Sequence, residues 1–188
     1  MTRKQALDLL HEKMENTNLR RHCYAVEAVM RALAKHFKED EEEWGVAGLI
    51  HDVDYEKVKD TAETDHTIVA LKWLEDLGAS ENIKKSVKRH AWGFVKDAPE
   101  PQTQMDWSLY CCDELTGFIV AVALIKEEKK LSMVGLKSVK KKWKQKAFAA
   151  GVHREQIEMC EEKLGIPLDE FIQIALSAMQ EISVELGL

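Results

Sequence analysis

Residues 48–54 of the chain read GLIHDVD, an apolar run that leads directly into a histidine and two aspartates. Apolar residues around this stretch recur at spacings of three and four, which predicts helices rather than strands. Neighbouring side chains of a helix point about 100° apart, so His51 and Asp52 can approach one point only where the helix unwinds. We therefore predict a helix that opens at Asp40 and ends near His51.

The same periodicity continues along the 188 residues and predicts an all-α fold of about nine helices. The length is near that of one domain and allows a substantial core. We predict a single domain over residues 1–188, with a core at about 18–127 and C-terminal helices at 131–188 that pack on it. The predicted helices are 2–14, 18–37, 40–51, 64–78 (with a cap at Thr64 or Asp65), 80–90, 103–125, 136–148, 153–164 and 167–188.

Charge and composition exclude several classes of protein. The net charge is −6 and the pI about 5.7, so we expect no nucleic acid polymer and no membrane as partner, one local basic run apart. The N-terminus resembles no signal peptide, and the richest apolar run, Phe118 to Ile125, is much shorter than the ~18 to 20 residues of a membrane span. Four cysteines without metal-knuckle spacing indicate free thiols. We predict a cytoplasmic protein of unknown oligomeric state.

Several histidines and one distant aspartate lie on the apolar sides of their predicted helices. His22, His66 and His90 each share a face with apolar residues, and so does Asp113 in the longest helix. A lone carboxylate that faces a core is costly unless it is paired or bound to a metal. Four histidines and two aspartates suit a divalent transition metal such as Mn, Fe, Ni, Co or Zn, with Mg also possible. The candidate ligands are His22, His51, Asp52, His66, His90 and Asp113.

The order of these residues resembles the HD-domain superfamily of metal-dependent phosphohydrolases. Its pattern of a histidine, a His-Asp doublet and a distant aspartate is matched here by His22, His51-Asp52 and Asp113. The phrases AGLIHDVDYE, CDELTGFIVAVALI and SVKKKWKQKAFAAGVHRE are similar to those of one bacterial and archaeal branch of uncharacterised HD-domain hydrolases. The likeness runs from His22 to about Leu188 and implies an HD-type helical bundle.

The resemblance also implies roles for the candidate ligands. His22, His51, Asp52 and Asp113 would hold a first metal, and Asp52 would bridge to a second ion held by His66 and His90. A hydroxide made available by the metal would attack a phosphomonoester of a nucleotide or another small phosphorylated metabolite. Asp52, His66 and His90 are thus the catalytic candidates. If the second ion is weakly bound or absent, either histidine would instead serve as general acid or hold a phosphate oxygen.

A basic run, Lys137 to Lys146, is the main cationic feature of the acidic chain. Most of these lysines are expected to lie on a solvated helix face. Helical spacing places Lys142 and Lys146 on one side. We hypothesise that Lys142, Lys146 and Arg154 hold the phosphates of the substrate.

Two other functions use the same residues. A di-iron oxygenase would consume oxygen with bound iron, whereas a hydrolase would release phosphate with Mn or Co. A regulatory module would keep the metal for stability and bind a nucleotide without turning it over. Asp54 is predicted to orient a ligand.

Overall fold

The computed structural model describes all 188 residues and contains helices and no strands, which confirms the predicted all-α fold. The longer helices are α1 (Arg3–Lys13), α2 (Thr17–Phe37), α3 (Glu41–Ile50), α6 (Ile68–Asp76), α7 (Glu81–His90), α8 (Gln104–Leu124), α9 (Leu136–Trp143) and α11 (Leu168–Glu181). Shorter segments are α4 (Tyr55–Val58), α5 (Ala62–Asp65), α10 (Arg154–Met159), α12 (Ser183–Leu186), a 3₁₀ turn at Leu131–Met133 and a π-helical turn at Cys160–Leu164.

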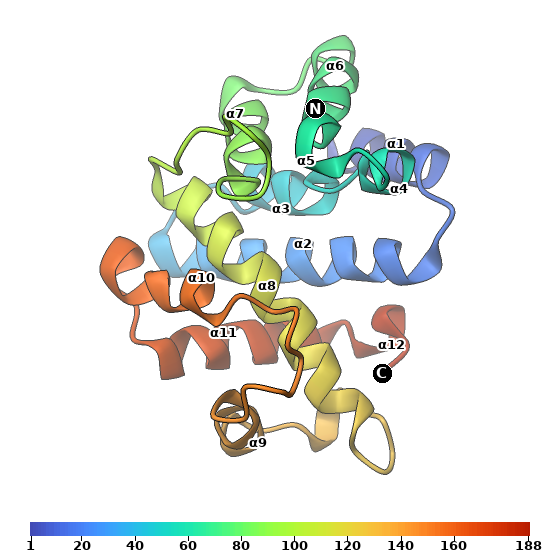
Figure 1. Ribbon diagram of the computed structural model, residues 1–188. Helices are drawn as coiled ribbons and strands as arrows, with labels where there is room; N and C mark the ends of the chain where they lie inside the picture. Colours follow the sequence, from blue (N-terminus) through green and yellow to red (C-terminus); the bar gives the residue numbers. More distant parts are fainter.

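Helix α2 runs across the middle of the molecule (Figure 1). Helices α1, α3 and α7 lie on one side of it, α11 lies on the other, and α8 crosses it. Apolar residues of α2, such as Val26 and Leu33, share one continuous hydrophobic core with Phe171 and Met179 of α11. The C-terminal helices are therefore built into the same core as the segment that carries the candidate ligands.

Several helix starts follow the predicted caps. The Asp40 carboxylate accepts hydrogen bonds from the N–H groups of Glu42 and Glu43, and the side chains of Ser80 and Thr103 cap α7 and α8 in the same way. Helix α2 begins earlier than predicted, because Asn16 rather than Asn18 supplies the cap.

Other boundaries differ from the predictions. The predicted helix 64–78 is broken: α5 ends at Asp65, α6 begins at Ile68, and Thr67 between them has a φ of 66°. A positive φ is unusual for a β-branched residue, and periodicity cannot reveal it. The basic helix α9 ends at Trp143, before the predicted residue 148, and the last helix breaks at Ile182.

Gly48 allows α3 to pack tightly on α2. A Cβ atom at this position would lie 2.9 Å from the carbonyl oxygen of Val26 and 3.0 Å from the side chain of Met30. Because only glycine avoids these contacts, its presence in GLIHDVD brings the C-terminal end of α3 against α2.

Helix α8 is long and apolar enough to cross a membrane by length and composition. However, 67% of its most apolar window is buried inside the protein, as in a core helix of a soluble protein. This finding gives no clear membrane signal, and the cytoplasmic location stays a prediction.

Candidate metal centre

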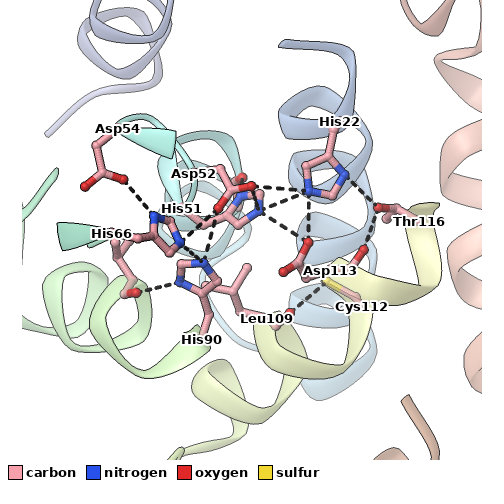
Figure 2. A network of polar contacts seen from close by, with 12 residues as sticks. His22, His51, Asp52, Asp54, His66, His90, Leu109, Cys112, Asp113 and Thr116 are labelled. Atoms are coloured by element: carbon pink, nitrogen blue, oxygen red, sulfur yellow. Dashed lines mark hydrogen bonds and ion pairs between the residues drawn. The ribbon is translucent and has the colours of Figure 1, made fainter. Parts of the chain in front are cut away.

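The six candidate ligands converge from five parts of the chain (Figure 2). His22 lies in α2, and Asp113 lies in the middle of α8. His90 is the last residue of α7, and the doublet directly follows α3. The sixth residue, His66, caps the C-terminal end of α5. The prediction that it lies on the apolar face of a helix was therefore wrong. Its side chain nevertheless reaches the cluster, where it contacts Asp52.

One half of the cluster is formed by His22, His51 and Asp113. The Nε2 atom of His22 lies 2.9 Å from Oδ1 of Asp113 and 3.3 Å from Nε2 of His51. Oδ1 of Asp113 is also 3.5 Å from Nε2 of His51. One oxygen of Asp52, Oδ2, faces this group at 3.5 Å from His51 and 3.8 Å from His22.

The other half is formed by His66 and His90. Their Nε2 atoms lie 3.2 Å apart, and each is 3.3 Å from Oδ1 of Asp52. The two oxygens of Asp52 therefore face different groups of histidines.

Contacts at Nδ1 orient the imidazole rings of His51 and His90. Nδ1 of His51 is 2.8 Å from the carbonyl oxygen of Gly48, and Nδ1 of His90 is 2.5 Å from that of Val87. A carbonyl oxygen can only accept, so Nδ1 carries the proton in both rings. In the neutral rings Nε2 then presents a lone pair to the cluster.

The other two rings are held by side chains. Nδ1 of His66 donates to Oδ1 of Asp54 at 2.9 Å, in agreement with the predicted orienting role of Asp54. Nδ1 of His22 is 3.2 Å from Oγ1 of Thr116, whose hydroxyl donates to the carbonyl oxygen of Asp113. The Thr116 hydroxyl oxygen can accept a hydrogen bond from Nδ1 of His22. The Nε2 atom of this ring therefore also faces the cluster.

Burial and charge oppose each other in the cluster. Burial lowers the pKa of His51, but Asp52 and Asp113 outweigh it and raise this pKa to about 9. Burial likewise lowers the pKa of His66, and Asp52 and Asp54 raise it to about 10. Burial raises the pKa values of Asp52 and Asp113, but the neighbouring histidines hold both well below the usual range. For His90, burial prevails and lowers the pKa.

The donor set fits a divalent metal ion. The neutral imidazoles would place pairs of Nε2 lone pairs 3.2 to 3.3 Å apart, and two carboxylates stand beside them. All-neutral rings would repel one another at these distances unless a cation, either a proton on Nε2 or a metal ion, lies between them, and the mixed nitrogen and oxygen donors suit transition metals. Two groups can each supply three ligand atoms: His22, His51 and Asp113, and His51, Asp52 and His90.

Comparison with protein families agrees with this geometry. The family model described as "HD domain" matches residues 19–117, just over half of the chain. The chain belongs to the HD-domain family. All six clustered residues lie within the matched segment, which extends from the start of α2 to the middle of α8.

Membership places the chain in a superfamily of metal-dependent hydrolases. HD domains bind divalent metals, and the clustered His and Asp residues of this chain are positioned to hold one. No curated protein matches the chain.

Arg154, one of the predicted phosphate ligands, has other partners in the structure. The guanidinium of Arg154 donates to several backbone carbonyls, among them those of Trp143 and Phe148, and it stacks on the ring of Phe118. Because these carbonyls use its donors, Arg154 positions the 144–153 segment and is not available as a phosphate ligand. The role of Lys142 and Lys146 stays a prediction.

Thr116 and Phe94, which sequence patterns did not assign to the site, contribute to it, and so does Tyr55, which flanks the candidate ligands in the sequence. Thr116 lies one turn after Asp113, a spacing that points to a shared helix face. Tyr55 and Phe94 place their rings 5.5 and 6.3 Å from the ring of His66. Phe94 lies in a loop without periodicity, so no sequence signal identified it.

A cavity of about 910 Å³ lies between α1, α2 and α11 and is lined by residues such as Tyr24, Arg31 and Ile174. None of the six clustered residues lines it. The candidate centre is therefore identified by its donor atoms and not by the volume of a cavity.

Proposed function

We propose that this HD-domain protein is a phosphohydrolase that acts on a phosphomonoester of a nucleotide or another small phosphorylated metabolite. The observation that carries the proposal is the position of Asp52. Its Oδ2 faces His22 and His51, and its Oδ1 faces His66 and His90, so one carboxylate is shared by two ligand groups.

Divalent ions at these groups would neutralise charge on phosphoryl oxygens and lower the pKa of water toward about 7. The protein's contribution is to hold the donors in place. The contacts of Gly48, Val87, Asp54 and Thr116 with the Nδ1 atoms keep the four Nε2 atoms directed at one small volume. Such preorganisation avoids rearrangement during the reaction.

His66 is the better of the two proton donors if a single ion binds at the His22 group. Its ring lies between two carboxylates, with Oδ1 of Asp52 at 3.3 Å from Nε2 and Oδ1 of Asp54 at 2.9 Å from Nδ1. His90 has only one carboxylate neighbour and a backbone carbonyl. In that case His66 would hold a proton at Nε2 and give it to the leaving oxygen.

The surroundings of His66 support a substrate with a planar or apolar group. Phe94 is 51% exposed although it is one of the larger apolar side chains, and its ring lies near His66. Tyr55 stands edge-on to the same imidazole. Exposed aromatic rings beside a polar centre can stack on a nucleobase.

The test is a phosphate-release screen over nucleoside monophosphates and sugar phosphates, with protein loaded with Mn²⁺ or Co²⁺. We expect release from at least one nucleotide, and a loss of at least ~100-fold with Asp52→Asn. Activity that survives this substitution would overturn the mechanism. Oxygen consumption by the iron-loaded protein without phosphate release would instead establish the oxygenase, and tight nucleotide binding without turnover would establish a regulatory module.

We keep Lys142 and Lys146 as proposed phosphate contacts. Each is to be replaced by alanine, with Lys72→Ala on α6 as the control. A raised Michaelis constant is expected for the first two, and an unchanged one would exclude them.

A further inference from the structure

One segment of the chain carries a large net positive charge. Residues 126–146 contain nine lysines and two glutamates and so have a net charge of +7. The rest of the chain has a net charge of −13, which gives the total of −6. The overall charge therefore hides a strongly basic region. This region joins the end of α8 to α9 at the lower end of the molecule in Figure 1.

Three lysines in and directly after α9 form an exposed row. Lys137, Lys141 and Lys144 follow each other at spacings of four and three and form one exposed stripe. Val139, on the opposite side of the helix, is fully buried in the hydrophobic core. The only ion pair of the segment joins Lys140 to Asp169 of α11, so the outer stripe keeps its charge.

Exposed aliphatic side chains lie in the same region. Six large apolar side chains of the protein are exposed, and three of them, Leu124, Ile125 and Met133, fall within ten residues at the end of α8 and the following turn. Lys126 ties this turn to α9, because its ammonium donates to Oγ of Ser138 at 3.0 Å. The exposed aliphatic residues and the basic helix therefore lie next to each other.

We propose that this surface, formed by Leu124, Ile125, Met133, Lys137, Lys141 and Lys144, docks on an anionic lipid membrane. Lysines near an anionic bilayer gain electrostatic attraction, and aliphatic side chains among them insert between lipid headgroups. A nucleic acid is the less suitable partner. The segment contains no arginine, and its one aromatic ring, Trp143, packs on Phe118, as does the nearby Phe148, so neither ring stands free for bases.

The test is co-sedimentation of the intact protein with vesicles at low salt and at about 0.15 M salt. Vesicles of phosphatidylcholine alone are compared with vesicles that contain about one third phosphatidylglycerol. We expect binding to the second kind only, and weaker binding as salt rises. The triple variant Lys137→Glu, Lys141→Glu, Lys144→Glu should bind about a hundredfold more weakly or worse, since each lysine contributes about fivefold.

A matched control distinguishes the effect of this surface on binding from the effect of the protein's net charge. Lys72→Glu, Lys85→Glu, Lys88→Glu changes the total charge equally at exposed positions of α6 and α7 and should retain binding. The variant Leu124→Ser, Ile125→Ser, Met133→Ser should lose the binding that survives at higher salt, and thermal melting checks the folding of all variants. No binding to anionic vesicles, equal loss in the control, or binding of single-stranded RNA without binding of vesicles would each overturn the proposal.

Discussion

The Nε2 atoms of His22 and His51 lie 3.3 Å apart although the two residues are 29 positions apart in the chain. The close approach depends on Gly48, one turn before His51, where a Cβ atom would lie 2.9 Å from the carbonyl oxygen of Val26. The first half of the metal centre is therefore a consequence of how closely α3 packs on α2.

Gly48→Ala should push α3 away from α2 and weaken metal binding. We expect a loss of about 1–3 kcal/mol in the free energy of unfolding, as for other overpacked cores, measured by urea denaturation. Gly117→Ala is the control: it is also inside a helix, but its Cβ meets no atom within 4 Å. That variant should gain up to about 1 kcal/mol, and equal effects in both variants would contradict the packing argument.

Asp54→Asn should weaken the His66 half of the centre more than the His22 half. The two oxygens of Asp54 accept from Nδ1 of His66 and from the N–H of Ala70. An amide has one oxygen, so its NH₂ group would face one of these donors. We expect the affinity for the ion at the His66 group to fall 10–100-fold and the affinity for the ion at the His22 group to stay the same. Calorimetric titration with Mn²⁺ measures both. The exposed Asp60→Asn is the control, and equal weakening of both ions would exclude the role of Asp54.

Metal binding should strengthen as the pH rises from about 6 to 9. The pKa values of about 9 for His51 and about 10 for His66 mean that both rings hold a proton near neutral pH when no metal is bound. The metal must displace these protons, so calorimetry in buffers of different ionisation enthalpy should detect proton release. A metal affinity that does not change with pH would contradict this competition between protons and metal at His51 and His66.

The metal-free protein should show the opposite trend in stability. A histidine whose pKa is raised on folding contributes stability that is complete below its unfolded pKa of about 6.5 and is lost as the pH rises through the folded value. The free energy of unfolding should therefore fall between about pH 6.5 and 10 in the absence of metal. Urea denaturation over this range measures it, and a rise across the range would refute the raised pKa values.

Phe94→Ala should raise the Michaelis constant for a nucleotide about 2- to 10-fold, because a stacked aromatic ring contributes about 0.5–1.5 kcal/mol. The loop holds Phe94 outward between Gly93 and Asp97, whose φ angles are 82° and 61°, while Val95 anchors it in the interior. A sugar phosphate should be affected much less. Val184→Ala, at an exposed position of α12, is the control, and an equal effect on both substrates would exclude stacking.

Much of this centre could be predicted from the sequence because its ligands lie at helix ends and on helix faces. The adjacent His51 and Asp52 can both face one site only at the end of a helix, and α3 does end at Ile50. A carboxylate such as that of Asp113, which faces the core, needs a paired group, and Nε2 of His22 lies 2.9 Å from it.

Other features depend on contacts that periodicity does not encode. Thr67 interrupts the predicted helix with a positive φ, and Asp54 holds the residues on both sides of it, His66 and Ala70. Arg154 looked like a phosphate ligand by charge, but backbone carbonyls that lie near it only after folding use its donors. Such long-range contacts follow from the packing of helices and not from local sequence.

The most direct test of the shared role of Asp52 is the number of ions bound by each chain. Protein is dialysed to equilibrium against Mn²⁺ and its metal content is measured, for the wild type and for Asp52→Ala. Because Asp52 faces both ligand groups, the wild type should hold two ions per chain and the variant fewer than one. A variant that holds as many ions as the wild type, or a wild type that holds none, would contradict the account.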